Sequence, residues 1–299
     1  MEIIEFTYKD APKNLEKMNL CLGFFDGLHL GHQKIIASAK KDGVKVGLLS
    51  FSEPPSYVLG YRKDNKCLMS IDDKANVGEQ FGVDYLLILH FDEECACITR
   101  EEFVNNILNN INPNKIFVGE DFKFGFEGKG NPKYLSKFFD VKITPILKKQ
   151  NNKISSRKIR ELVEEGNIKA ANSLLGHHYA VAGNVVNGLH NGTSIGFPTA
   201  NLKIDFPYVV PKNGVYLGNC IVREEKKKCL ICVSNHPSIM KLNSPIIEVH
   251  ILDFNEDLYG VFIAVSFIEK IRDIILFDNL DDLKSQIEKD KQKLINSKY

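Results

Sequence analysis

The pattern of apolar segments changes near residue 175, and this change constrains the fold more than any other feature. Before it, apolar segments of strand length alternate with segments that place apolar residues on one helical face. After it, short apolar or alternating segments follow one another with only turn-forming residues between them. Alternating strands and helices form parallel βαβ units, whereas consecutive strands form small antiparallel barrels. The sequence therefore predicts two domains of different class, residues 1–174 and 175–299.

The first half predicts a Rossmann-like α/β domain with a parallel sheet. A helix over residues 99–111 has its apolar side chains on one face, and Thr99 with Glu102 forms a capping box at its start. Ligands of such sheets bind at the carboxyl ends of the strands. Because G-x-G-x-x-G is absent from the sequence, a dehydrogenase is disfavoured. The expected strands are residues 20–24, 44–51, 84–89, 115–118 and 141–145.

The second half predicts a small antiparallel β-barrel with one closing helix. Asn279 is the expected cap of that helix. The lysine run at residues 226–228 reads as a solvated hairpin tip. The expected packing stripe of the helix is Leu280, Leu283, Ile287 and Leu294. The expected strands are residues 179–186, 214–222, 229–234, 246–253 and 261–268.

A glycine-rich turn, G-F-F-D-G-L-H-L-G-H over residues 23–32, precedes a helical pattern over residues 33–41. The backbone N–H groups of a helix start, approached through glycines, suit a bound anion. His29 and His32 are three residues apart, so both can face one phosphate chain. A tight turn with two solvated histidines is the alternative. The other expected phosphate-binding residues here are Gly23, Phe24, Asp26, Gly27 and Gly31.

Two further segments of the first half carry polar residues at the ends of predicted elements. Asp121 lies in G-E-D-F-K-F-G, directly after a predicted strand, where it suits a nucleotide pocket, although a glycine-ended loop with aromatic anchors is the alternative. Ser155 and Ser156 open a helical pattern as N-caps. Arg160, one turn later, can reach an anion at that helix start. We expect Ser155, Ser156 and Arg160 to bind phosphate groups.

The segment G-F-P-T-A-N at residues 196–201 is the strongest signal of the second half, with a turn-rich hairpin as its alternative. Thr199 and Asn201 offer oxygens on one strand face, and hard oxygens together with substrate phosphates are typical ligands of Mg²⁺. Glu248 stands in an apolar strand, where an unpaired charge is costly, so its presence there needs a reason. The expected nucleotide-binding residues are Gly183, Gly188, Gly196 and Pro198.

Together these motifs resemble those of the bacterial bifunctional riboflavin kinase/FAD synthetases. H-x-G-H resembles the signature of the nucleotidyltransferase superfamily, and G-F-P-T-A-N resembles that of riboflavin kinases. The resemblance implies that ATP phosphorylates riboflavin to FMN and that a second ATP adenylylates FMN to FAD, with release of pyrophosphate. It also implies that Glu248 takes the proton of the riboflavin 5′-hydroxyl, and that His29 and His32 stabilise charge on the ATP phosphates.

The chain departs from the family's pattern at several positions. Two alternatives to a bifunctional enzyme therefore remain, namely a riboflavin kinase with a weakened adenylyltransferase half and a flavin-binding regulator without turnover. The departures are Pro54 in place of a pocket histidine, Cys95 in place of an aromatic residue, Arg157 in place of a threonine or serine, Thr193 in place of an arginine, and Ile274 in place of an acidic residue.

Composition narrows the class of partner. The 39 basic and 38 acidic side chains leave a net charge of +1, which gives no overall field to attract nucleic acid or an anionic membrane. No apolar run approaches the ~20 residues needed to span a bilayer. The seven cysteines, an odd number, argue against a complete disulfide framework. We expect a cytoplasmic enzyme that acts on riboflavin, FMN and ATP and binds neither nucleic acid nor membrane, and the sequence leaves its oligomeric state open.

Overall fold

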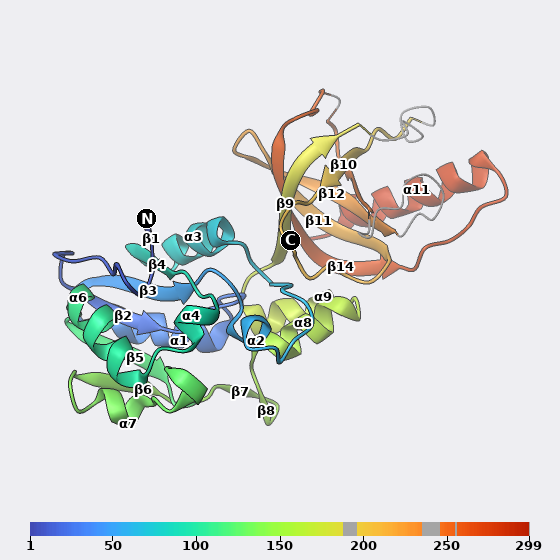
Figure 1. The fold of residues 1–299 in the computed structure, drawn as a ribbon. Helices are drawn as coiled ribbons and strands as arrows, with labels where there is room; N and C mark the ends of the chain where they lie inside the picture. Colours follow the sequence, from blue (N-terminus) through green and yellow to red (C-terminus); the bar gives the residue numbers. More distant parts are fainter. Residues whose placement is uncertain (188–195, 235–245, 255, 299) are drawn as a thin grey trace. The chain divides into compact units, whose positions relative to one another are not determined.

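The computed structural model describes residues 1–187, 196–234, 246–254 and 256–298. The chain divides into two compact units, Met1–Ser156 and Arg157–Tyr299 (Figure 1). The helices α8 (Ser156–Glu164) and α9 (Ile168–Leu175) thereby fall almost wholly in the second unit, whereas the predicted boundary after residue 174 left them in the first. The residue at which the second domain begins to fold on its own stays a prediction. None of the helices in the described ranges is long and apolar enough to cross a membrane.

A six-stranded parallel sheet forms the first unit and confirms its predicted α/β class. The strand order is β1-β4-β3-β2-β5-β6, and every neighbouring pair is parallel. The chain runs outward from β2 to β3 and β4 and then returns to β5 on the other side of β2, so the order reverses between β2 and β5. Such a switch point opens a crevice for ligands. The strands are β1 (Glu2–Phe6), β2 (Met18–Leu22), β3 (Lys45–Phe51), β4 (Tyr85–Leu89), β5 (Lys115–Gly119) and β6 (Val141–Thr144).

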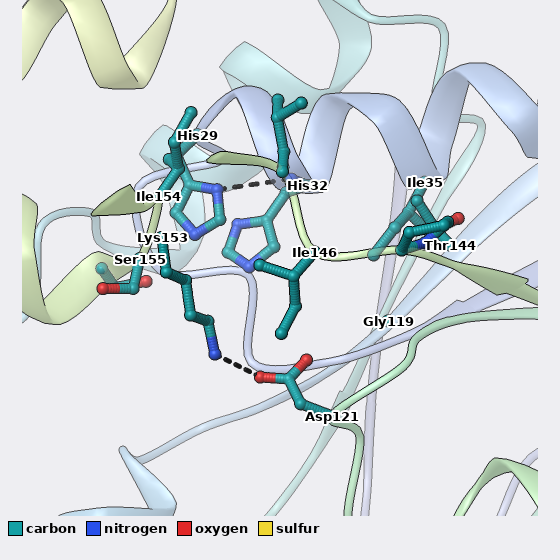
Figure 2. Close-up of a pocket in the computed structure, with 14 residues that line it drawn as sticks. His29, His32, Ile35, Gly119, Asp121, Thr144, Ile146, Lys153, Ile154 and Ser155 are labelled. Atoms are coloured by element: carbon teal, nitrogen blue, oxygen red, sulfur yellow. Dashed lines mark hydrogen bonds and ion pairs between the residues drawn. The ribbon is translucent and has the colours of Figure 1, made fainter. Parts of the chain in front are cut away.

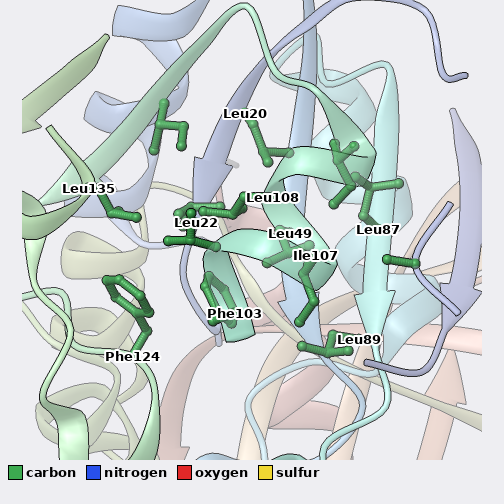
Figure 3. Packing of buried hydrophobic residues seen from close by; sticks show 14 of the residues in the cluster. Leu20, Leu22, Leu49, Leu87, Leu89, Phe103, Ile107, Leu108, Phe124 and Leu135 are labelled. Atoms are coloured by element: carbon green, nitrogen blue, oxygen red, sulfur yellow. The ribbon is translucent and has the colours of Figure 1, made fainter. Parts of the chain in front are cut away.

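Helices cover both faces of this sheet. On one face, α1 (Leu30–Ala39) packs over β2, where the Asn19 side chain donates a hydrogen bond of 2.7 Å to the Ala39 carbonyl. The opposite face carries an apolar core, since alternate strand residues point to opposite faces (Figure 3). This core includes Leu20, Leu22, Leu49, Leu87 and Leu89 of the strands and Phe103, Ile107 and Leu108 of the helical segment that covers them.

The predicted helix over residues 99–111 is continuous but not uniform. It consists of α5 (Arg100–Glu102), the π-helical segment η2 (Phe103–Leu108) and α6 (Asn109–Ile111). The capping box of Thr99 and Glu102 is confirmed. The remaining elements of this unit are η1 (Lys40–Asp42), α2 (Pro55–Val58), α3 (Ile71–Gln80), α4 (Glu93–Ala96), η3 (Phe126–Gly128), α7 (Pro132–Leu135), β7 (Lys148–Lys149) and β8 (Asn152–Lys153).

A closed antiparallel barrel forms the second unit and confirms its predicted class. The strand order around the barrel is β10-β13-β12-β11-β14-β9. Strands β9 and β11 have the predicted bounds, whereas β10 was not predicted as a strand. The strands are β9 (Tyr179–Val186), β10 (Ala200–Lys203), β11 (Gly214–Val222), β12 (Glu225–Ser234), β13 (Ile246–Ile251) and β14 (Phe262–Arg272).

The closing helix α11 (Leu280–Asn296) packs on the outer face of the barrel. Its predicted cap is confirmed, because the Asn279 side chain accepts a hydrogen bond from the Asp282 N–H. Leu294 packs on Leu217 of β11 and Leu230 of β12. The predicted stripe is wrong at one end, since Leu280 is 61% exposed.

Polar contacts that the sequence did not predict also hold α11. The buried carboxylate of Asp290 accepts a hydrogen bond of 2.7 Å from the Arg272 guanidinium of β14. Lys228 donates to the carbonyls of Leu294 and Ser297 at the end of the helix. The expected hairpin tip is therefore wrong for Lys228, which lies in β12 and caps α11; the turn itself lies at residues 223–224.

Candidate active sites

A cavity of about 220 Å³ lies in the first unit at the carboxyl ends of β5 and β6, beside the start of α1 (Figure 2). It adjoins the switch point of the sheet, as expected for this topology. The structure thus gathers residues from three separate sequence motifs. The predicted residues that line the cavity are His29, Gly31, His32, Asp121, Ser155 and Ser156, and Gly119, Thr144, Ile146 and Lys153 are among the others.

His29 is the N-cap of α1. Its Nδ1 accepts a hydrogen bond of 3.3 Å from the backbone N–H of His32. Because Nδ1 accepts, the proton of the neutral ring lies on Nε2. The rings of His29 and His32 stack, with centroids 3.6 Å apart and planes 13° apart (Figure 2). The cap therefore sets both the tautomer of His29 and the orientation of its ring.

The ring of His32 is enclosed more deeply. Burial, and then the neighbouring His29 and Lys74, hold the pKa of His32 well below its ordinary value. Phe25 packs edge-on against this ring, with centroids 5.1 Å apart. The Nδ1 atom of His32 is buried and has no hydrogen-bond partner within the described part of the chain. His32 is consequently neutral at pH 7, so it acts as a hydrogen-bonding group rather than as a fixed cation.

Backbone strain shapes the turn that leads into α1. Phe25 has a φ of 54° and Leu28 a φ of 38°, both in the left-handed region that is costly for residues with a β-carbon. Both side chains are buried, which holds them in place. A Cβ at Gly31 would lie 3.0 Å from Cε1 of His29, so a larger residue there would displace the imidazole. The glycine thus leaves room for the ring of His29.

The other predicted residues of this turn do not line the cavity. The buried carboxylate of Asp26 accepts a hydrogen bond of 2.7 Å from the Leu68 N–H. The carbonyl of Asp26 accepts one of 2.8 Å from the Ser156 hydroxyl, which ties the turn to the serine motif. Gly23 donates its N–H to the Leu49 carbonyl. Direct ligand contacts of Gly23, Phe24, Asp26 and Gly27 stay predictions.

Lys153 is a cavity residue that the sequence analysis missed. Its ammonium lies 2.5 Å from the Asp121 carboxylate, and both side chains are about half exposed (Figure 2). The only sequence signal was its place immediately before the serine motif. Arg160 lies one turn beyond Ser156 on α8, and its predicted phosphate contact stays untested.

Of the five departures from the family's pattern, four lie within the described residues. Cys95 is buried in the core of the first unit. Pro54 is buried and forms the N-cap position of α2. Arg157 is exposed and pairs with Glu161 on its own helix. Ile274 is 39% exposed, and Thr193 lies outside the described residues.

In the second unit, cross-strand pairing brings the predicted base and one predicted metal ligand together. Glu248 of β13 pairs directly with Asn201 of β10 on one side and with Cys232 of β12 on the other. Directly opposite side chains have Cβ atoms about 4.5–5.5 Å apart. Burial, and then the charge of Glu248, raise the pKa of the Cys232 thiol to about 11. The row Asn201, Glu248 and Cys232 is called the carboxylate row below.

The carboxylate row lies on the outer face of the barrel. Cys232 and Leu230 are two residues apart on β12 and so share a face, and Leu230 packs against Leu294 of α11. The row is therefore on the side of the sheet that α11 covers. Arg272 belongs to this face as well, since it pairs with Val215, which in turn pairs with Cys232.

The segment that carries Thr199 is fixed by a histidine. The ring Nδ1 of His250 lies 2.8 Å from the Pro198 carbonyl, and the ring contacts Phe197 edge-on. Thr199 immediately precedes β10 rather than sharing a regular strand face with Asn201. A Cβ at Gly183 would lie 2.3 Å from the Lys203 carbonyl, so this glycine permits the close approach of β9 and β10. Gly188 lies outside the described residues.

Comparisons with known proteins match both units. Residues 11–158 match the model of the FAD synthetase family, and residues 175–297 that of the riboflavin kinase family. The bifunctional riboflavin kinase/FMN adenylyltransferase of Bacillus subtilis (strain 168) is 36% identical over 290 residues, which cover 93% of this chain and 92% of that protein. The Escherichia coli (strain K12) protein of the same name is 33% identical over 301 residues, or 97% and 96% of the two chains. A crystal structure described as a macrolide-efflux protein from Streptococcus pneumoniae is 29% identical, with a TM-score of 0.90 over 100% of both chains.

Proposed function

The chain belongs to the family of bifunctional riboflavin kinase/FMN adenylyltransferases, and from this membership we propose which residues perform each reaction. It phosphorylates riboflavin with ATP, which gives FMN, and it transfers the adenylyl group of a second ATP to FMN, which gives FAD and pyrophosphate. The cavity at the histidine pair serves the adenylyl transfer, and the carboxylate row serves the phosphorylation. A cytoplasmic location and the absence of nucleic-acid or membrane partners stay predictions.

The histidine cavity supports adenylyl transfer by its donors. An oxygen of the FMN phosphate attacks the α-phosphorus of ATP, the bond to the bridging oxygen breaks, and pyrophosphate leaves. Such reactions depend on positioning and on electrostatic stabilisation of the phosphate oxygens. The Nε2–H of His29 and the backbone N–H groups at the start of α1 are donors that suit the negative charge of the phosphates. Lys153 and Ser155 line the same cavity and add a cation and a hydroxyl donor.

The pairing of Asn201 with Glu248 is the observation that carries the kinase assignment. Glu248 takes the proton of the riboflavin 5′-hydroxyl while that oxygen attacks the γ-phosphorus of ATP and ADP leaves. The hydroxyl of Thr199, the amide oxygen of Asn201 and the neighbouring carboxylate form a set of hard oxygens, which fits Mg²⁺. Thr199 and Asn201 would hold this ion, which when bound neutralises charge on the ATP phosphates.

One experiment tests the function of the whole chain. The purified protein is incubated with riboflavin, ATP and Mg²⁺, and the flavins are separated by chromatography. We expect FMN first and then FAD. Formation of FMN alone would support the monofunctional alternative, and no conversion with retained flavin binding would support the regulator.

A further inference from the structure

A lysine that the proposed reactions do not use lies beneath the strained turn of the histidine site. Lys74 of α3 is only 3% exposed. Its ammonium donates to the Phe24 carbonyl at 2.9 Å and to the Ser50 hydroxyl at 2.7 Å. The ammonium also lies 4.7 Å from the centroid of the Phe24 ring. Burial of a lysine is costly, so this contact needs a reason.

The contacts of Lys74 converge on the backbone that positions His32. The Ser50 hydroxyl donates to the same Phe24 carbonyl at 2.8 Å, so this carbonyl accepts two hydrogen bonds. Phe25, the next residue, has the left-handed φ of 54° and packs its ring against His32. A buried anchor on the preceding carbonyl therefore fixes the strained residue that supports the imidazole.

We propose that Lys74 is a positioning residue of the adenylyltransferase site, which holds the turn before α1 through the Phe24 carbonyl and keeps a positive charge behind His29 and His32. This inference rests on the proposed function of the histidine cavity. Lys74 itself is not a wall residue of that cavity, so its effect passes through the turn and through its charge.

Electrostatics support the same role. Burial lowers the pKa of Lys74 to about 8, while the negative charge of Asp26 and the nearby Cys67 oppose that shift. Lys74 is thus mainly protonated at pH 7, and its charge is one of the causes of the low pKa of His32. A fixed cation in a buried place also favours negative charge on bound phosphates.

The test compares Lys74→Met with Lys41→Met, an exposed lysine of the same unit that serves as the matched control. We expect kcat for FAD formation from FMN to fall about 10- to 100-fold in Lys74→Met, with KM for FMN changed less than about threefold, because a misplaced donor affects the transition state most. Riboflavin phosphorylation by the same sample should stay within about twofold. The NMR titration of the His32 ring should move to higher pH, because a nearby positive charge is lost.

Two further variants change the same hydrogen bonds in other ways. Lys74→Gln retains a donor without the charge, so it should recover part of kcat but leave the His32 titration shifted. If Lys74→Met does not fold, Ser50→Ala removes a partner of both Lys74 and the Phe24 carbonyl and should reduce kcat for FAD in the same direction. An unchanged kcat and an unchanged His32 titration in a folded Lys74→Met would overturn the inference. A different outcome is that the wild-type protein makes no FAD although the His32 titration still moves in Lys74→Met. In that case the proposed function fails, and the effect of the Lys74 charge on His32 stands.

Discussion

At the scale of single residues, His29 combines two roles that substitution can separate. Asparagine is a good N-cap but has no Nε2–H. We expect His29→Asn to keep the stability of α1 and to lower FAD formation strongly, whereas His29→Ala should also lose about 1 kcal/mol of the free energy of unfolding. Flavin chromatography and guanidinium unfolding would measure the two effects. Equal FAD formation in His29→Asn and wild type would remove this imidazole from the reaction.

The histidine pair as a whole should be essential to one reaction only. We expect the double variant His29→Ala, His32→Ala to lose FAD formation and to phosphorylate riboflavin normally. His90→Ala, which changes an exposed histidine of the same unit, is the control. A double variant that makes FAD at the wild-type rate would contradict the assignment of this cavity.

Glu248 should be essential to the other reaction, the phosphorylation of riboflavin. A general base contributes typically ~10²–10⁴-fold, so Glu248→Gln should reduce FMN formation by such a factor and leave FAD formation from supplied FMN nearly unchanged. Glu225→Gln, an exposed carboxylate on β12, is the matched control. Kinase activity within a few-fold of wild type would exclude Glu248 as the base.

The low pKa of His32 also makes stability depend on pH. In the unfolded chain this histidine takes up a proton below pH ~6.5, whereas in the folded chain burial delays that uptake to lower pH. The free energy of unfolding of the first unit should therefore fall as pH drops below ~6.5, by at most about 1.4 kcal/mol per pH unit. Guanidinium unfolding at pH 7.5 and 5.5 should show a smaller difference in His32→Gln than in wild type. An equal difference would mean that other groups cause the loss.

The sequence identified the residues that line the cavity better than the residues that support them. His29, His32 and Asp121 were predicted because their motifs are local in the chain. Lys74 and Asp290 were missed because a lysine or aspartate in an amphipathic helix normally faces solvent. The partner of Lys74 is Phe24, fifty positions away. Only the packing of α3 against the sheet brings the two together.

At the scale of elements, long strands with strong patterns were predicted and short edge strands were not. Strands β9 and β11 match their predicted ranges, and most of the parallel strands differ by two residues or fewer. The short strands β1 and β10 were missed, because they form through pairing with β4 and β13 rather than through local propensity. This matters for the site, since β10 carries Asn201.

The closing helix gives a prediction at this scale. Asp290 on α11 is 1% exposed and pairs with Arg272, so Asp290→Ala leaves a largely buried guanidinium without its partner. We expect a loss of about 2–4 kcal/mol in the free energy of unfolding of the second unit and a marked fall in FMN formation. Glu288→Ala, an exposed position on the same helix, should change neither. Urea unfolding and the flavin assay would test this. Asp290→Ala with wild-type stability would show that the pair does not hold the helix.

At the scale of the whole molecule, the two activities should be separable. We expect residues 175–299 to fold and phosphorylate riboflavin, because this fragment contains Thr199, Asn201, Glu248 and α11. A fragment of residues 157–299 should be more stable, since it retains α9, whose Asn172 side chain donates to the Phe267 carbonyl and accepts from the Tyr179 N–H. Circular dichroism and the flavin assay would compare both. An inert longer fragment would mean that the kinase site needs the first half.

The placement of the carboxylate row has a consequence for how activity arises as the chain folds. Its three residues come from three different strands, and Asn201 stands on β10, which joins β9 to β13 and so completes the ring. A sheet in which β13 lacks either β10 or β12 cannot hold this group of side chains together. Phosphorylation of riboflavin therefore reports the pairing of β13 with both neighbours, and during refolding it should return only after both pairings have formed.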